Sequence, residues 1–500
     1  MKICFACDLH LSNIEDTLQY DVFDFVLSDV QKERPDCIIY AGDVTCDGNI
    51  EVYKSFVSRA SSLGMPFLFV PGNSDLRDAR YRDEIKKLSS PILTVICGKK
   101  IFAVNDCEAI ISDSDLEALE SADKDSIVFM HHPIISLKDG SDGKFLAWRT
   151  SHPDTMLFYG HKHKPMREGR TVSLQALDPD KAIGSNPCLT YYDTDTDELT
   201  SSYYVSKVPA DLHNRLGISC YKVREHIALA TKNKLKSLEL RPSCITMNES
   251  ELDSLIKKWR EAGGENLSIH IPDISYADGR AIPDENLGKY IELANKLGVN
   301  RFTQHVPKAS VQLVRSDSSA LSKMAECLAS YFSALDHEVV IGIENMHMTK
   351  NDSLDGERRF GYTPEECIEF MEILSTKTSC KVGINFDIGH ARNNHPFSWT
   401  NQISTWFAKL GKYIVGYHLH QVNGDPGKNI ENHIAFDSIY GRLISLCSFF
   451  KCWETGRINK APVVFEMRPA GAYEQTLALF NSYKLRNSLE DMRNENNENR

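Results

Sequence analysis

Short apolar runs alternate with amphipathic segments in the first part of the chain. Runs the length of buried strands occupy residues 1–8, 37–43, 66–73, 126–133 and 155–161. Segments 17–33 and 51–64, between the first three runs, have the apolar spacing of helices. This alternation is typical of an α/β sheet with helices on its faces. Turn-rich, strand-like segments at 171–177 and 188–206 complete the pattern and predict one α/β domain over residues 1–208.

A second rhythm begins after residues 207–215, which we interpret as a linker. Eight strand-like runs follow, at 216–221, 237–242, 267–272, 301–307, 339–345, 382–390, 414–421 and 463–469. Helix-length amphipathic segments, such as 249–264, 285–298 and 363–375, separate them. Eight βα units within about 270 residues have the length and count of a (β/α)8 TIM barrel. The pattern therefore predicts a barrel over 209–485, followed by a polar tail at 486–500.

Composition changes this picture little. Five hundred residues with a net charge of −12 suit an acidic chain of more than one domain, and argue against a broad surface that coats nucleic acid. The fourteen cysteines are scattered, which favours reduced thiols over a disulfide framework. No apolar run approaches the length of a membrane span. We expect a soluble, cytoplasmic protein that does not bind membranes.

Residues able to bind metals follow the apolar runs of the first domain. They are Asp8 and His10, Asp43 after Gly42, Asn73, the pair His131 and His132, and the pair His161 and His163. Carboxylate, imidazole and amide donors at successive strand ends suit Mn, Fe or Zn. Asp43 follows a glycine that permits close approach and is suited to bridge two ions. Two ions roughly 3.5–4 Å apart can orient a water molecule for phosphoryl displacement.

These motifs (D-x-H, G-D, G-N-x-D, H-x-P and G-H-x-H) resemble those of the calcineurin-like metallophosphoesterases over roughly residues 1–205. The resemblance implies an α/β sandwich whose two ions, Mn2+ or alternatively Fe or Zn, share Asp43. It places Asp8, His10, Asp43 and His163 at one ion, and Asp43, Asn73, His131 and His161 at the other. His131 is favoured over His132 because the fixed histidine of that family lies two residues before a proline.

One position departs from the family pattern. Ser74 stands where the family usually has a histidine close to the leaving group. A serine hydroxyl is a poor general acid near neutral pH. We therefore expect hydrolysis of esters with good leaving groups to persist, whereas cleavage that releases an alkoxide is placed in doubt.

The strands of the second segment also end in potential ligands. They are His270, His305, Glu344, the pair Asp387 and His390, the pair His418 and His420, the loop residues Glu431 and His433, and Glu466. The chemistry of a TIM barrel lies at the carboxyl ends of its strands, so these side chains should meet at one mouth. A buried carboxylate without a partner is costly, which favours a metal at Glu344, Asp387 and Glu466.

Residues 215–480 resemble the xylose-isomerase-like barrel superfamily, which includes endonuclease IV and many sugar-phosphate isomerases and epimerases. The core shared by both branches maps onto Glu344, Asp387, His418 and Glu466. The endonuclease branch binds further zinc ions, and its additional ligands match His270, His305, His390, Glu431 and His433. The complete set favours the multinuclear branch, with Zn2+ or Mn2+. Gln421 departs from the aspartate which that branch has near the end of strand seven.

Three hypotheses follow for the whole chain. The first is a metal-dependent phosphoesterase with two active domains that acts on nucleic acid or nucleotides, with Asp43, Glu344 and Glu466 as catalytic residues. Segments 241–244 and 392–399 would then supply arginines and wedge residues for nucleic acid. The second joins a phosphatase to a sugar or sugar-phosphate isomerase or epimerase, in which Glu344 and Glu466 would move a proton. The third treats the first domain as a non-catalytic relic. Assembly with itself or with a partner protein stays open.

Overall fold

The computed structural model describes residues 1–349, 352, 358–424 and 431–484. It divides into two compact units, one made of Met1–Ser206 with Ile439–Ser448, the other of Lys207–Ser438 and the chain from Phe449 onward. The break after residue 206 lies two residues from the boundary at 208/209 that the sequence predicts. The membership of residues 439–448 in the first unit was not predicted. The polar tail predicted at 486–500 lies outside the described residues.

The first unit is an α/β sandwich built on two sheets. One has the strand order β11 (Glu198–Tyr203), β10 (Cys188–Asp193), β1 (Lys2–Ala6), β2 (Cys37–Ala41), β3 (Phe67–Val70). The other has the order β4 (Leu93–Ile96), β5 (Lys99–Ala103), β6 (Ile127–Met130), β7 (Met156–Tyr159), β9 (Thr171–Ser173), β8 (Met166–Glu168). The sequence did not predict β4 and β5.

Apolar side chains from the two sheets form one core between them. Within it, the rings of Phe5 and Phe158 stack with their centroids 3.8 Å apart. The outer faces carry α1 (Leu18–Glu33), α2 (Ile50–Ser61), α3 (Arg82–Lys87), α4 (Asp113–Leu119) and α5 (Ser141–Ser151). The side chain of Asn49 starts α2 by accepting hydrogen bonds from the N–H groups of Glu51 and Val52. The predicted sheet-and-helix layering is confirmed.

Several hydrogen bonds attach residues 439–448 to the rest of the first unit. Gly184 N–H donates to Tyr440 O (2.9 Å), and Ser445 N–H donates to Asp180 O (3.3 Å). The Tyr440 hydroxyl donates to Ser206 O (3.3 Å), and Ser206 Oγ donates to Cys447 O (3.2 Å). This segment therefore belongs to the fold of the first unit although the chain reaches it only after the seventh barrel strand.

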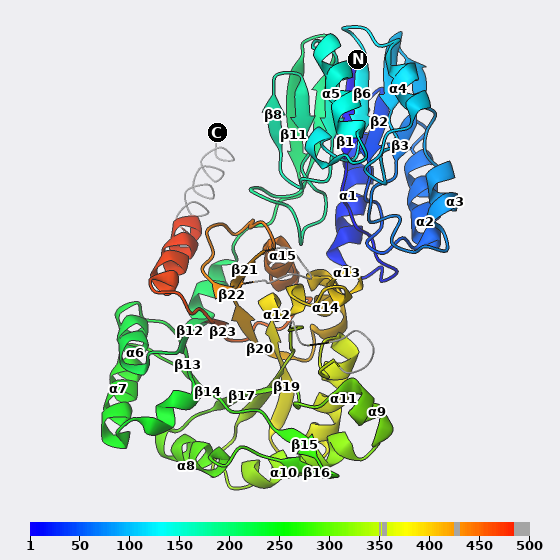
Figure 1. The fold of residues 1–500 in the computed structure, drawn as a ribbon. Coiled ribbons are helices and arrows are strands. Elements are labelled where there is room, and N and C mark those ends of the chain that lie inside the picture. Colours follow the sequence, from blue (N-terminus) through cyan, green and yellow to red (C-terminus); the bar gives the residue numbers. More distant parts are fainter. Residues whose placement is uncertain (350–351, 353–357, 425–430, 485–500) are drawn as a thin grey trace. The chain divides into compact units, whose positions relative to one another are not determined.

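The second unit is a closed barrel of eight strands, with helices around it (Figure 1). The strands are β12 (Leu216–Cys220), β13 (Ser237–Leu240), β14 (Asn266–His270), β17 (Arg301–His305), β18 (Val340–Glu344), β19 (Lys381–Asp387), β20 (Ile414–Leu419) and β23 (Val463–Phe465). All neighbours pair in parallel, and β12 pairs with β23 to close the ring. The predicted (β/α)8 barrel is confirmed.

The elements between the strands follow the predicted helical segments. They are α6 (Val223–Lys232), α7 (Glu249–Glu261), α8 (Leu287–Leu297), α9 (Val311–Ser316), α10 (Ala320–Phe332), α11 (Pro364–Ser375), α12 (Ile388–Arg392), α13 (Phe397–Thr400), α14 (Ile403–Leu410) and α15 (Cys447–Thr455). Two short hairpins, β15 (Ser275–Ala277) with β16 (Arg280–Ile282) and β21 (Gln421–Asn423) with β22 (Glu431–Ile434), extend loops after the strands.

Two expectations drawn from the composition can be compared with the structure. All fourteen cysteines are free thiols, as the scattered pattern predicts. Among the described residues, none of the helices has the length and apolar character that crossing a membrane requires.

Candidate metal centres

Four predicted ligands of the first unit lie together at the carboxyl ends of its parallel strands. Asp8 and His10 follow β1, Asp43 follows β2 and His163 follows β7, and their donor atoms all lie within 4.8 Å of one another. His10 Nε2 is 3.2 Å from Asp43 Oδ2, and His163 Nε2 is 3.5 Å from Asp8 Oδ1. The group matches the set that the resemblance assigned to one ion.

The remaining predicted ligands lie on the other side of Asp43. His131 Nε2 is 3.5 Å from Asp43 Oδ1 and 3.2 Å from Asn73 Oδ1. His161 Nδ1 is 3.0 Å from the same Asn73 oxygen and 3.3 Å from His131 Nε2. Asp43 therefore contacts ligands of both groups, as a bridging carboxylate would. His132 also lies in this cluster, but its Nδ1 atom faces Asp106 at 3.2 Å.

The backbone at these ligands is unusual. Asp8, His10, Asp43, His161 and His163 all adopt positive φ angles, between 52° and 64°. This left-handed region is unfavourable for residues other than glycine, and such strain gathers at functional sites. Five strained ligands in one cluster indicate that the fold holds these side chains for chemistry.

Buried polar groups fix the motif that carries Ser74. Asp75 accepts hydrogen bonds from the N–H groups of Thr45 (2.7 Å) and Gly72 (2.9 Å). Ser74 N–H donates to Asp43 Oδ1 at 2.8 Å, while its hydroxyl donates to Thr45 O at 2.6 Å. The Ser74 hydroxyl is thus engaged with the backbone, which agrees with the expectation that it does not serve as a proton donor.

The two imidazoles beside Asn73, those of His131 and His161, have pKa values shifted in opposite directions. Burial lowers the pKa of His131, but the carboxylates of Asp43 and Asp8 outweigh it and raise the pKa to about 9. Burial, with His131 as the next cause, lowers the pKa of His161 to about 3. His161 is therefore neutral at physiological pH, and its lone pair is available to a cation.

One carboxylate that supports the first centre, Asp178, was not predicted from the sequence. Asp178 is buried, and its Oδ2 atom lies 3.3 Å from His10 Nδ1 and 3.2 Å from Lys181 Nζ. Carboxylates that face the second nitrogen of a ligating histidine fix the orientation of its ring. The only signal in the sequence was an acidic residue directly after an apolar run at 174–177.

Two further clusters share Glu344 at the carboxyl mouth of the barrel. One contains His270, His305 and Glu344, and the other contains Glu344, Asp387, His418 and Glu466. Glu344 Oε2 is 3.1 Å from His270 Nε2 and 3.8 Å from His305 Nε2. Its Oε1 atom is 3.2 Å from His418 Nδ1, which in turn is 2.8 Å from Glu466 Oε2. All but His305, which is partly exposed, are buried.

A third cluster contains His390, His420 and His433. His420 Nε2 lies 3.1 Å from Asp387 Oδ1, next to the second cluster. Burial, with the neighbouring imidazole of His420 as the next cause, lowers the pKa of His433 to about 2. Carboxylates act oppositely on His390, where Asp387 and Glu344 outweigh burial and raise the pKa to about 9.

The structure does not bring Glu431 to this cluster. Its side chain is exposed on β22, and His420 is the residue that joins His390 and His433. Residues two apart on an extended strand point the same way. His433 has a φ of 58° within β22, and its side chain is buried whereas that of Glu431 is exposed. In the sequence, the spacing of His418 and His420 was the available signal that His420 could take the place expected for Glu431.

The donor sets fit divalent metal ions. Buried side-chain atoms normally make hydrogen bonds. Among the described residues, Asp387 Oδ2, His420 Nε2, His433 Nδ1 and Glu466 Oε2 make none of acceptable geometry, although all are buried in these clusters. Lone pairs that converge without hydrogen bonds are the arrangement that a metal would satisfy.

Two further residues support the barrel centre. Glu239, in the middle of β13, is buried and lies 2.9 Å from His418 Nε2. Arg241 Nη1 lies 3.0 Å from Glu466 Oε1 and 3.5 Å from Glu239 Oε1. Arg241 was predicted as a nucleic-acid contact, whereas its guanidinium neutralises carboxylates of the metal centre. A charged residue inside the apolar run 237–242 was the available signal for Glu239.

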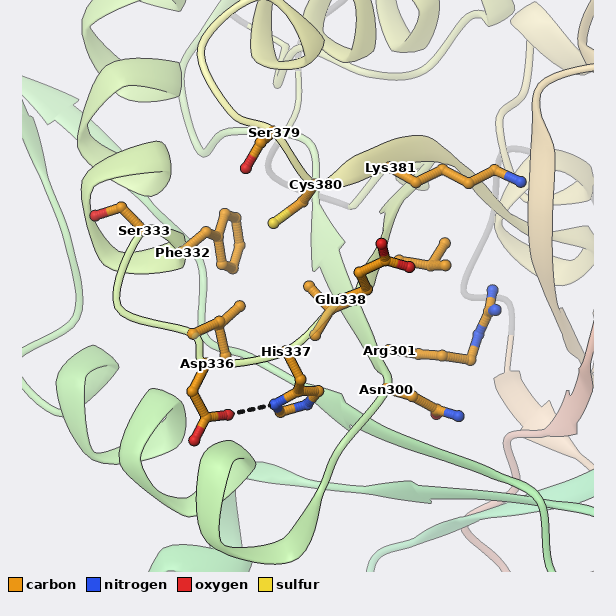
Figure 2. A pocket seen from close by; sticks show the side chains of 13 residues that line it. Asn300, Arg301, Phe332, Ser333, Asp336, His337, Glu338, Ser379, Cys380 and Lys381 are labelled. Atoms are coloured by element: carbon orange, nitrogen blue, oxygen red, sulfur yellow. Dashed lines mark hydrogen bonds and ion pairs between the residues drawn. The ribbon is translucent and has the colours of Figure 1, made fainter.

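A pocket of about 730 Å³ lies at the opposite, amino ends of β17, β18 and β19 (Figure 2). Arg301 and Lys381, the first residues of β17 and β19, line it together with His337, whose Nδ1 atom is 2.6 Å from Asp336 Oδ1. Among the described residues that line it there is no predicted metal ligand. This end of a barrel contributes to stability more than to catalysis, so we do not include the pocket in the metal centre.

Comparison with known proteins places two families on the chain in the predicted order. Residues 1–165 match the calcineurin-like phosphoesterase family, and residues 247–483 match the xylose isomerase-like TIM barrel family. A probable cyclic nucleotide phosphodiesterase of Xenorhabdus bovienii is 33% identical over 15% of this chain and 34% of its own length. A probable glycerophosphodiester phosphodiesterase of Arcobacter nitrofigilis is 26% identical over 27% of this chain and 50% of its own. The matches thus span half or less of these relatives.

Solved structures resemble each unit only distantly. A xylose isomerase domain protein from Planctomyces limnophilus is 15% identical, covering 56% of this chain and 96% of that one, with a TM-score of 0.37. A dimetal phosphatase from Danio rerio is 11% identical, covering 41% and 99%, with a TM-score of 0.30. Likenesses this distant carry no argument about activity.

Proposed function

The chain joins a calcineurin-like phosphoesterase domain to a xylose isomerase-like TIM barrel, and we propose that it is a metal-dependent hydrolase in which both units cut phosphoester bonds. The observation that carries the proposal is the set of clustered donors at each centre: two groups that meet at Asp43 in the first unit, and two that share Glu344 in the barrel. A carboxylate between neighbouring ions is the arrangement that in-line displacement at phosphorus uses.

The first centre would hold its ions, Mn2+ or alternatively Fe or Zn, through the seven residues predicted from the sequence. Such ions supply Lewis acidity and lower the pKa of bound water. The protein itself holds His131 and His161 beside Asn73 and contributes no proton donor at Ser74. This arrangement supports phosphodiesters with good leaving groups as substrates.

The barrel centre would hold Zn2+ or Mn2+. Its third cluster, His390 with His420 and His433, supports the multinuclear and therefore hydrolytic reading, with nucleic acid or a nucleotide as the substrate. Glu344 and Glu466 would orient the reacting groups, since both are buried and both contact His418.

A second candidate is a metal-dependent sugar or sugar-phosphate isomerase or epimerase. It is favoured by the four-residue cluster of Glu344, Asp387, His418 and Glu466, which would suffice for one ion between two carboxylates able to move a proton. The number of ions in the barrel distinguishes the candidates: one favours isomerisation, and two or three favour hydrolysis.

The test is metal content and hydrolysis in the full chain, because a fragment ending at residue 208 would lack residues 439–448 of the first unit. Elemental analysis of the protein, of Asp43→Asn and of Glu344→Gln counts the ions at each centre. Each variant is then assayed on bis(p-nitrophenyl) phosphate and on a duplex with an abasic site. We expect Glu344→Gln to lose at least two ions, and the double variant Asp43→Asn/Glu344→Gln to lose the hydrolysis that persists in Asp43→Asn. A barrel with a single ion that cuts neither substrate would reject the hydrolase proposal and support the isomerase.

A further inference from the structure

A pocket of about 480 Å³ lies beside the barrel metal centre, at the carboxyl ends of β12 and β23. It is lined by the start of α6 and by the loop that follows β23. Tyr221 forms the wall on the side of the metal centre, since its hydroxyl donates to Glu466 Oε1 at 2.5 Å. One side chain therefore separates this pocket from a predicted metal ligand.

Two arginines contact the ring of Tyr221, and they differ in their partners. The guanidinium of Arg241 lies 4.9 Å from the ring centroid, and its charge is matched by Glu466 at 3.0 Å. The guanidinium of Arg468 lies 5.8 Å from the centroid and lines the pocket. Arg468 makes no ion pair with any residue that the structure describes. Its backbone is fixed, because Arg468 N–H donates to His433 O at 2.9 Å.

The pocket is lined by three other charged residues, Lys222, Glu225 and Glu474. Lys222 and Glu225 pair with each other at 3.1 Å. Lys222 is also the N-cap of α6 and supplies no side-chain hydrogen bond, so the first N–H groups of this helix, whose first turns line the pocket, have no cap from the Lys222 side chain. Glu474 is the one lining carboxylate that has no ion pair among the described residues.

We propose that this pocket binds a phosphate group of the barrel substrate, next to the bond that lies at the metal centre. The inference rests on the proposed hydrolysis and narrows its substrate class to molecules that carry a second phosphate. A planar guanidinium held against an aromatic ring is suited to phosphate. The second phosphate could belong to a nucleic-acid strand or to a small bisphosphate.

The experiment is calorimetric titration of inorganic phosphate into the metal-loaded full chain carrying Asp43→Asn, which suppresses phosphate binding at the first centre. We expect Arg468→Gln to weaken one phosphate site by about tenfold, the loss of one charge-assisted contact. Glu474→Gln should tighten the same site by removing a repulsive charge. Lys232→Gln, which removes an exposed charge at the far end of α6, should change neither affinity nor stoichiometry.

Equal phosphate binding in Arg468→Gln and Lys232→Gln would overturn the proposal. Competition then identifies the source: displacement of phosphate by a 5′-phosphorylated thymidine dinucleotide or by a sugar bisphosphate supports the pocket, and displacement by neither overturns it. Hydrolysis of bis(p-nitrophenyl) phosphate by the same Asp43→Asn protein is measured separately. An Arg468-dependent phosphate site in a barrel that hydrolyses nothing would reject the proposed function alone, whereas hydrolysis without this site would reject the pocket alone.

Discussion

Replacing Asp178 with asparagine should weaken metal binding at the first centre while the domain stays folded. Asp178 faces the nitrogen of His10 that points away from Asp43, at 3.3 Å, and its charge is balanced by Lys181 at 3.2 Å. Asparagine has almost the same shape, so the change removes charge and little volume. It also leaves Lys181 as an uncompensated cation close to His10 and to the metal.

The size of the effect follows from these distances. Two unit charges 3.3 Å apart interact with about 5 kcal/mol at an effective dielectric constant of about 20, which is an upper bound. Lys181 offsets part of that attraction, because its charge acts on His10 in the direction opposite to that of Asp178. Carboxylates that orient a ligating histidine typically contribute about 10- to 100-fold in metal affinity. This range corresponds to about 1.4–2.7 kcal/mol, well within the bound.

The assay is competition between the full chain and a chromophoric chelator, with Mn2+ or Zn2+ as the probe. The control is Asp142→Asn, which removes an exposed carboxylate from α5 in the same unit. Thermal unfolding of both variants establishes that the fold is retained. If Asp178→Asn and Asp142→Asn bound metal with equal affinity, the orienting role of Asp178 would be refuted.

Three further outcomes are expected. Gly72→Ala should lose metal from the first centre, because its Cβ atom would clash with Asp43 and stand 2.8 Å from His131 Cε1; Gly143→Ala, which meets open space, should retain the full content in elemental analysis. A fragment of residues 1–208 should unfold at a lower temperature than the first unit does in the full chain, because it lacks residues 439–448; equal melting temperatures would contradict this role of the segment. In the native protein Cys97 should react first with a thiol reagent near neutral pH, because it is the exposed cysteine, whereas burial raises the pKa of thiols such as Cys107 to about 12. The Cys97→Ser variant should lose the fastest phase of the thiol reaction. An unchanged fast phase in this variant would refute the prediction.

The architecture was accessible from the sequence because its signal is local. Each barrel strand is a short apolar run between turn residues and a helix, so eight strands could be located without knowledge of the contacts. The same reasoning predicted the ligands, because a polar residue directly after a buried strand must lie at the carboxyl edge of a parallel sheet. Asp43, Glu344 and Glu466 are of this kind. Strands β4 and β5 were not predicted although both contain apolar residues: β4 alternates exposed and partly buried positions, and β5 begins with two lysines.

Other features depended on tertiary structure, because they are set by backbone conformation and by partners distant in the sequence. The family resemblance implies that Glu431 joins His433, but in the structure Glu431 is exposed and His420 is grouped with His390 and His433 instead. Glu239 and Asp178 gain their roles only from the histidines that they face across the fold. The chain itself determines which donors reach the mouth of each unit. Only the packed structure decides which of them converge, because convergence requires loops from separate strands to adopt compatible conformations at the same point.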